Sequence, residues 1–151
     1  MRRQDRKITD NEALEILNKG EHGILSMSKG NNEAYGIPLN YVLKDNNIYF
    51  HCALEGSKLN YLKTNNKVSF CVVGKTELLP SKFSTIYESV IVAGEISDVE
   101  GEDKRNALLW IIEKYSLEHL QKAKKYIDNT FDEVKVIRLS ITSISGKARK
   151  K

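Results

Sequence analysis

The fold of this chain is decided by a stretch in its first half, His51-Cys52-Ala53-Leu54-Glu55-Gly56-Ser57-Lys58. Its first residues end an apolar strand-like run, and Gly56 then interrupts the run directly before a short helical segment over 58–64. The first amides of a helix lack partners within the helix, and the helix dipole makes that end positive. Ser57 directly precedes this helix, at the expected cap position. Together with the Lys58 ammonium and the Ser57 hydroxyl, these amides predict an anion site at the corner. An ordinary capped turn is the alternative interpretation.

The residues before this corner alternate as a β-hairpin does. Apolar side chains occupy every second position over 33–44 and again over 47–54, and the polar residues 45–47 suit a tight turn. Pairing Lys44 with Asn47 places every inward apolar residue opposite another one, whereas a one-residue slip would not. A two-residue shift would keep the faces and change the partners. The favoured register predicts these opposed pairs: Leu43–Ile48, Tyr41–Phe50, Leu39–Cys52, Asn40–His51 and Pro38–Ala53.

Composition bounds the class of protein. The chain has 151 residues, of which 40% are hydrophobic and 29% charged, as expected for a packed globule of one domain, 1–151. It contains no apolar run long enough to cross a bilayer, and its first residues lack the apolar core of a signal peptide. The two cysteines form no CxxC pair, and no Cys/His cluster with zinc-ligand spacing occurs. We therefore expect a cytoplasmic protein with free thiols, no metal site and no membrane contact.

The formal net charge of +4 is concentrated at the two ends of the chain. Solvated tails are the favoured interpretation of these charges. No aromatic residues interleave with them, so a nucleic-acid site is not expected. A contact of Lys147 or Arg149 with an anionic ligand stays open as a third interpretation. The clustered residues are Arg2, Arg3, Arg6, Lys7, Lys147, Arg149, Lys150 and Lys151.

The remaining periodicities predict short strands with helices at their margins. Strands that follow one another through tight turns favour an antiparallel sheet, and few crossover helices are available for a parallel one. The fold class predicted is mainly β, an antiparallel split β-barrel with accessory helices. We expect a bulge or a bend at Gly94 inside a long strand. The predicted helices are 8–19, 58–64, 103–115 and 117–127, the further strands are 22–28, 67–74, 84–99 and 133–145, and 75–83 is a predicted loop.

Several of these segments together resemble a known family. They are GIPLNYVL (36–43), IYFHCALEGSKLNYL (48–62), KVSFCVV (67–73), YESVIVAGEI (87–96) and ITSISGK (141–147). In this order they resemble the flavin-nucleotide-binding, pyridoxamine 5′-phosphate oxidase-like split barrels, and most closely the branch named for 5-nitroimidazole resistance proteins. The most specific part is F-H-x-A-x-x-G-x-K, which begins at Phe50. The resemblance spans nearly the whole chain.

The resemblance implies FMN, bound in clefts between the two subunits of a homodimer. It places the strand Pro38-Leu39-Asn40-Tyr41 along the flavin ring and assigns His51, Cys52, Ala53, Ser57 and Lys58 to the ribityl-phosphate arm. It also implies that Ser89 and its neighbours close the site, and that Lys147 ends the last strand near the flavin. His51 is the candidate catalytic residue, because a histidine can donate a proton near neutral pH.

The function implied is that of an FMN-dependent oxidoreductase acting on a small acceptor such as a nitroaromatic compound. A flavin carrier or redox sensor without fixed turnover is the main alternative. A barrel that binds haem or nucleic acid is a further one. The residues do not distinguish FMN from FAD, and they name neither the electron donor nor the acceptor.

Overall fold

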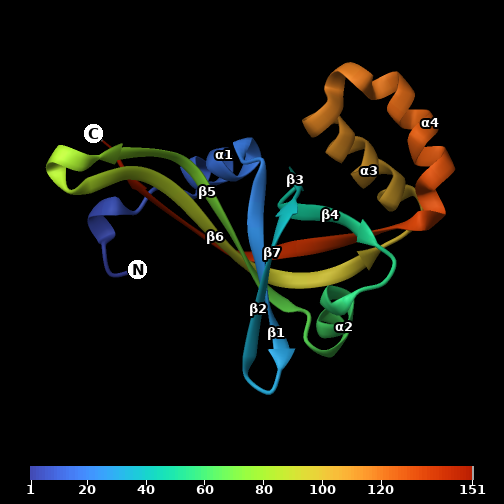
Figure 1. Cartoon of the computed structure of the whole chain (residues 1–151), viewed down its shortest axis with the longest axis horizontal. Helices are drawn as coiled ribbons and strands as arrows, with labels where there is room; N and C mark the ends of the chain where they lie inside the picture. Colours follow the sequence, from blue (N-terminus) through green and yellow to red (C-terminus); the bar gives the residue numbers. More distant parts are fainter. Residues whose placement is uncertain (151) are drawn as a thin grey trace.

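The computed structural model describes residues 1–150, which form a seven-stranded antiparallel sheet with four α-helices at its margins (Figure 1). The helices are α1 (Asp10–Lys19), α2 (Ser57–Thr64), α3 (Gly101–Ser116) and α4 (Leu120–Thr130). The strands are β1 (His22–Gly30), β2 (Glu33–Asn40), β3 (Val42–Lys44), β4 (Asn47–Ala53), β5 (Lys67–Leu79), β6 (Ser84–Val99) and β7 (Val134–Arg149). Short 3₁₀ turns cover Gln4–Arg6, Pro80–Lys82, Leu117–His119 and Phe131–Glu133.

The sheet closes into a barrel through one residue. The strand order is β2-β1-β5-β6-β7-β4-β3, so β2 and β3 lie at opposite edges of the sheet. In the chain these two edge strands are separated only by Tyr41. The chain therefore passes from one edge to the other within a single residue, and this joins the edges. The antiparallel split barrel predicted from the sequence is confirmed.

The predicted hairpin register is right near the turn and wrong beyond it. Lys44 pairs with Asn47 and Leu43 with Ile48, as predicted, and Asp45 and Asn46 form the turn with positive φ. Past Val42 the strand leaves β4 and pairs along β1 instead. The predicted cross-strand pairs of Leu39, Tyr41, Asn40 and Pro38 are therefore wrong: Asn40 lies opposite His22, and Pro38 lies opposite Ile24. Barrel closure causes the change, because β1 supplies a partner along the whole length of β2.

The core fills the interior of this barrel. The rings of Tyr41, Phe50 and Phe70 are fully buried, and Phe70 meets both of the others edge-to-face at centroid distances of 4.9 and 5.1 Å. A second apolar cluster lies outside the barrel, where α3 and α4 cover β4. There Tyr49 packs against Trp110 at 5.4 Å. Figure 1 shows these two helices as a hairpin standing over β4.

Two predictions for the second half of the chain have different outcomes. The predicted loop 75–83 is wrong for 75–79 and right for 80–83: β5 continues to Leu79, residues 80–83 connect it to β6, and the β5–β6 hairpin extends as an arm to the left of Figure 1. The strand was missed because this arm is held by strand pairing, and its apolar side chains pack against no core that would reveal a pattern. Phe83 at its tip is 99% exposed. A register shift between Ala93 and Gly94 against β7 confirms an irregularity at the predicted position, and the extra residue is Thr142 of β7. Among residues 1–150, no helix combines the length and apolar character that membrane crossing needs.

Candidate functional site

The corner between β4 and α2 presents backbone amides to solvent. Gly56 precedes the helix with φ 150°, a conformation that side-chain-bearing residues rarely adopt. It occupies the cap position that the sequence assigned to Ser57, and no side chain of the described residues caps the helix. The amides of Leu59 and Asn60 both bond to the Gly56 carbonyl, at 3.1 and 3.3 Å. The amides of Ser57 and Lys58 lie at the first helical positions, which have no acceptor within a helix.

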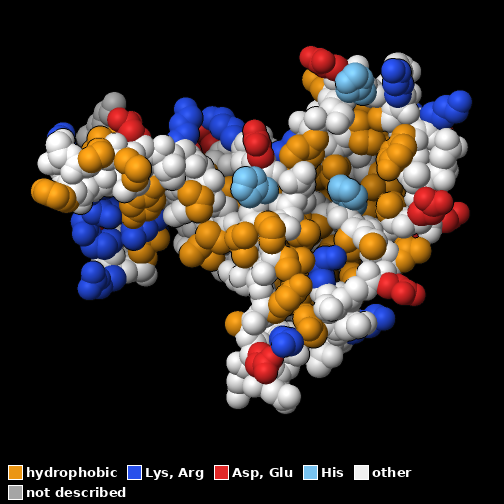
Figure 2. Space-filling view, in the orientation of Figure 1, with side chains coloured by type: hydrophobic (Ala, Val, Ile, Leu, Met, Phe, Trp, Pro, Cys, Tyr) orange, Lys and Arg blue, Asp and Glu red, His pale blue; other side chains and the backbone are white. Residues whose placement is uncertain are grey.

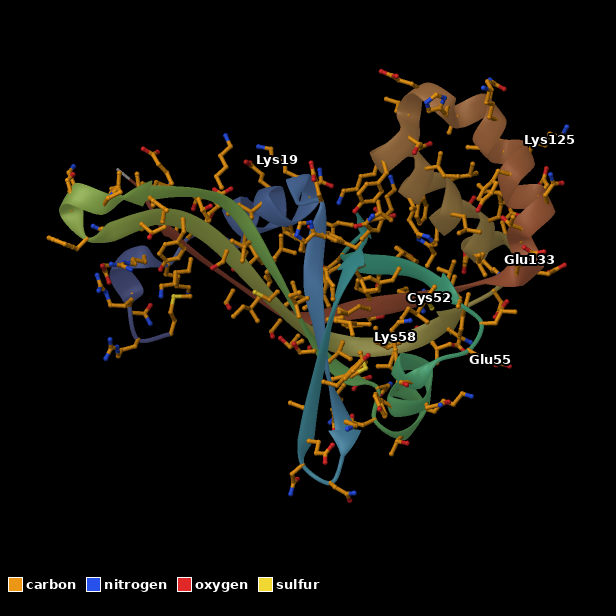
Figure 3. The ribbon with its side chains drawn as sticks, in the orientation of Figure 1. Lys19, Cys52, Glu55, Lys58, Lys125 and Glu133 are labelled. Carbon is orange, nitrogen blue, oxygen red and sulfur yellow. The ribbon has the colours of Figure 1, made fainter. Side chains whose placement is uncertain are left out.

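The charges at this corner favour an anion. Lys58 is partly buried and forms no ion pair with any described residue. Figure 3 shows Cys52 on β4 above it, with Glu55 directed outward on the far side of the turn from Lys58. Ser57 is exposed, and open space surrounds Gly56. The corner therefore offers one ammonium, one hydroxyl and two amides to a dianionic group.

A pocket of about 240 Å³ joins two of the predicted site residues. Asn40, at the end of β2, and His51, on the outer face of β4, both line it, although they do not pair across strands. Its opposite wall comes from the helical hairpin α3–α4. Desolvation in this pocket lowers the pKa of His51 below its ordinary value of 6.5, which favours the neutral imidazole. Figure 2 shows hydrophobic side chains gathered on the facing sides of the two helices and on the strands below.

The helical wall of this pocket was not assigned to the site from the sequence. Its residues include Leu108, Ile111, Ile112 and Tyr115. The apolar spacing of these residues predicts a helix with a buried stripe, and that helix is confirmed with bounds 101–116. The spacing does not tell whether the stripe covers a core or lines a cavity, because both need apolar side chains at the same positions.

Tyr115 holds the backbone where the barrel closes. Its hydroxyl accepts a hydrogen bond from the Tyr41 amide at 2.9 Å, and it lies within donating distance of the carbonyls of Glu21, at 2.5 Å, and Tyr41, at 2.9 Å. Tyr41 lies between β2 and β3 and is fully buried. The hydroxyl of Tyr115 therefore replaces ladder hydrogen bonds at the one residue that belongs to neither strand.

Lys114, on the same helix, gives a pH-dependent prediction. Its ammonium is buried without a hydrogen-bond partner among the described residues and lies 3.9 Å from the centroid of the Tyr41 ring. Burial lowers the pKa of Lys114 to about 8, from an ordinary value of 10.5, although the Glu21 carboxylate opposes the shift. The folded state thus binds this proton less tightly than the unfolded state does. Stability is reduced below pH 8 and recovers as the pH rises toward 10.5.

We expect Lys114→Met to raise the Tm at pH 7, and we expect this gain to disappear near the ordinary lysine pKa. Thermal melts of the variant and the natural protein in steps from pH 7 to 11 measure the difference. The exposed Lys124→Met on α4 is the control and should show no such trend. A Lys114→Met variant that is less stable at pH 7 would mean that the cation–ring contact outweighs the cost of burial.

The last two predicted site residues lie elsewhere in the same chain. Ser89 on β6 pairs directly with Lys147 on β7. His51 pairs with Val136, so Lys147 lies eleven residues further along β7 than the partner of His51. At about 3.3 Å per residue this is roughly 36 Å of strand. One chain brings Asn40 and His51 together and places Cys52, Ala53, Ser57 and Lys58 along the corner, but it leaves Ser89 and Lys147 apart from them.

The surroundings of Lys147 are strongly cationic. Its ammonium lies 5.7 Å from the centroid of the Tyr87 ring, and Arg6 donates a hydrogen bond of 3.3 Å to the Tyr87 hydroxyl. Both contacts lower the pKa of Tyr87, and the hydrogen bond from Arg6 has the larger effect. Arg149 donates to the Ser84 hydroxyl from the same strand. Lys147 and Arg149 are thus placed along β7 rather than on a free tail, and Lys151 lies outside the described residues.

No metal centre is formed by residues 1–150, because no three of their His, Cys, Asp and Glu side chains are placed to share an ion. Cys52 and Cys71 are free thiols, as predicted, and burial raises the pKa of Cys71. The chemistry available at the site is therefore that of hydrogen-bonding groups, one ammonium and an apolar pocket.

A closed antiparallel sheet with a helical hairpin at its margin defines a split-barrel protein. Comparison with known proteins supports the same class. The model of the family described as pyridoxamine 5′-phosphate oxidase matches residues 9–148. The chain belongs to that family. No curated protein matched it.

Solved structures share the fold at low identity. A candidate 5-nitroimidazole antibiotic resistance protein from Bacteroides thetaiotaomicron is 21% identical over 94% of this chain and 86% of its own, with a TM-score of 0.78. A FAD-binding protein from Mesorhizobium loti is 20% identical over 96% and 98%, with a TM-score of 0.68. A FAD and haem binding protein from Mycobacterium smegmatis is 14% identical over 97% and 74%, with a TM-score of 0.83.

Proposed function

We propose that the chain binds FMN and works as an FMN-dependent oxidoreductase on a small acceptor. The observation that carries this proposal is the uncapped start of α2 beside Lys58, in a chain of the pyridoxamine 5′-phosphate oxidase family. The residues fit a phosphate: positive φ at Gly56 bares the first amides, and no described carboxylate pairs with Lys58. A bound flavin would take electrons from a reduced donor and pass them to the acceptor.

In this proposal the chain's own residues bind, orient and protonate. Ser57 and Lys58 hold the phosphate, the backbone of 38–41 supports the ring, and Cys52 and Ala53 flank the ribityl arm. His51 is the proposed proton donor, because it lines the pocket together with Asn40 of the ring-supporting strand and a neutral imidazole still carries one N–H donor. Tyr115 fixes the backbone of Tyr41 and so fixes the support of the ring.

We also propose a homodimer in which the partner completes the site. Ile24, Val73 and Ile91 are 42%, 59% and 51% exposed on the outer face of β1, β5 and β6, where an exposed apolar row suits a subunit interface. Ser89 and Lys147 lie on that same face. Packing two such faces together would bring Ser89 and Lys147 of one subunit toward the corner of the other.

A flavin titration tests the proposal. Purified protein stripped of ligand is titrated separately with FMN, FAD and haem, and binding is followed by quenching of flavin fluorescence or by the haem Soret band. We expect saturable FMN binding and, by light scattering, a dimer. Protein that binds haem and neither flavin would overturn the proposal.

The alternative of a flavin carrier without turnover has a separate discriminator. Reduction of the bound flavin by NADH or NADPH, followed by reoxidation that depends on an added nitroaromatic compound, supports an enzyme. Flavin that neither nicotinamide donor reduces supports the carrier. The free thiols of Cys52 and Cys71 fit the reducing cytoplasm that we propose as its compartment.

A further inference from the structure

A second pocket lies at one end of the barrel, between α2 and the adjoining ends of β6 and β7. It has a volume of about 240 Å³. In Figure 1 the helix α2 lies below β6, at this end of the sheet. We infer that the pocket binds a monocarboxylate with an apolar chain of about six carbons, and that the carboxylate is directed at Lys135. The inference goes beyond the proposed flavin function and does not depend on it.

This pocket faces the interior of the barrel, whereas the pocket of Asn40 and His51 lies on the outer face of β4. Ile137 lines the inner pocket and pairs with Phe50, and both residues are fully buried in the barrel core. His51 follows Phe50 in the strand and therefore takes the opposite face. None of the described residues that we assign to the flavin lines the inner pocket. A ligand bound there is therefore a molecule other than the flavin.

Two charged side chains occupy inward positions of the strands at this end of the barrel. Asp98 on β6 pairs with Ile137 on β7, and directly paired residues share a face of the sheet. Lys135 precedes Ile137 by two residues in the same strand, so it also points inward. The Lys135 ammonium lies 2.8 Å from the Asp98 carboxylate, and the Lys135 side chain is only 20% exposed. Apolar residues at both positions would stabilise the barrel at least as well, so the charged pair indicates binding rather than packing.

The charges of the lining select a ligand with one negative charge. Besides Lys135 and Asp98, the described lining holds one further ionisable residue, Lys63 in the last turn of α2. Lys63 is exposed and forms no ion pair with any described residue. The lining therefore carries one more ammonium than carboxylate, and a monocarboxylate balances it. An ammonium has three N–H donors, so Lys135 can bond to Asp98 and to a ligand together.

The other walls set the apolar part of the ligand. Leu59 and Leu62 line the pocket from α2, and Ile96 lines it from β6. An apolar cavity of roughly 150 Å³ is enough to hold benzene, so about 240 Å³ admits a chain of about six carbons together with its carboxylate. Each methylene group buried there should strengthen binding roughly fourfold.

A series of probes tests the inference on the full chain free of flavin. Calorimetry at pH 7 measures the binding of acetate, hexanoate, decanoate and the neutral hexanamide. We expect hexanoate to bind, acetate and hexanamide to bind more weakly by roughly tenfold or more, and decanoate to bind no more tightly than hexanoate. The inference is overturned if hexanoate does not bind or if hexanamide binds as tightly. It is also overturned if affinity keeps rising up to decanoate, since the chain would then lie outside the pocket.

A charge variant locates the carboxylate. Lys135→Met removes the ammonium and keeps the length of the side chain, so hexanoate affinity should fall roughly tenfold or more while hexanamide affinity does not fall. Lys67→Met, at an exposed position of β5 outside the pocket, is the matched control and should leave both affinities unchanged. Unchanged hexanoate binding in a folded Lys135→Met variant overturns the inference.

A filled variant locates the chain. Ile96→Phe fills the pocket from β6, and Leu62→Phe fills it from α2 if the first variant does not fold. Either folded variant should lose hexanoate binding, and retained binding overturns the inference. Titration with FMN is a separate measurement on the same protein. Hexanoate binding by a chain that takes no flavin would overturn the proposed function and leave this inference standing, and the reverse result would do the opposite.

Discussion

Replacing Lys58 by alanine is expected to raise the dissociation constant for FMN roughly 10- to 150-fold. A hydrogen bond to a charged group contributes about 1.5–3 kcal/mol, and each 1.4 kcal/mol is a factor of ten in affinity. Binding should survive in weakened form, because the amides of Ser57 and Lys58 and the Ser57 hydroxyl remain. Fluorescence quenching in a titration of the ligand-free variant measures the effect.

The matched control for this variant is Lys63→Ala. Lys63 lies on the same helix, is exposed and belongs to its last turn, far from the amides that open the helix. Its loss should leave the FMN affinity unchanged while removing the same formal charge. If both variants weaken FMN equally, the effect is one of overall charge, and Lys58 does not hold the phosphate. The difference should also shrink with added salt to the extent that the contact is exposed.

Replacing Tyr115 by phenylalanine is expected to lower the free energy of unfolding by about 1–3 kcal/mol, the usual cost of leaving a buried hydrogen-bonding group without a partner. The variant leaves the Tyr41 amide without a partner, because this amide donates a hydrogen bond of 2.9 Å to the Tyr115 hydroxyl. For a chain of this size the loss corresponds to a fall in Tm of roughly 2–10 °C. Thermal or urea unfolding of the ligand-free protein measures it.

Tyr126→Phe is the control for the missing hydroxyl. Tyr126 lines the same pocket from α4, but its side chain is 64% exposed, so water satisfies its hydroxyl. Its removal should leave stability within about 0.5 kcal/mol, as for most surface changes. A Tyr115→Phe variant as stable as Tyr126→Phe would mean that water replaces the hydroxyl at the closure, and that Tyr115 is not needed to hold it.

Local patterns predicted the parts of the fold that depend on near neighbours in the chain. The turn at 45–46 and the pairs next to it follow from residues that tolerate positive φ and from matching apolar faces. The bulge at Gly94 follows from a glycine inside a strand, and an added Cβ there would meet the Ser140 carbonyl oxygen at 2.1 Å. The corner at Gly56 was predicted for the same kind of reason. Its cap is the glycine rather than Ser57, because only glycine readily adopts φ 150°.

Errors arose where a strand had two possible partners. The alternation over 33–44 is equally compatible with pairing to β4 along its whole length and with the observed change of partner at Tyr41. Local periodicity reports which face a side chain takes and not which strand lies beside it. The hairpin arm that includes 75–83 was missed because its two strands pair only with each other there, and because its apolar side chains pack against no core.

The sequence by itself determined the antiparallel class, the inward faces of the strands over 33–40 and 47–53 and the family of this protein, and it predicted the anion corner, because these depend on short stretches and on their order. Only the tertiary structure decided that Asn40 and His51 meet in a pocket rather than across a ladder, that Tyr115 holds the backbone where the barrel closes, and that Ser89 and Lys147 lie eleven residues along β7 from the partner of His51. These facts depend on contacts between residues distant in the chain. Such contacts are set by closure of the sheet and by the packing of the helical hairpin against it.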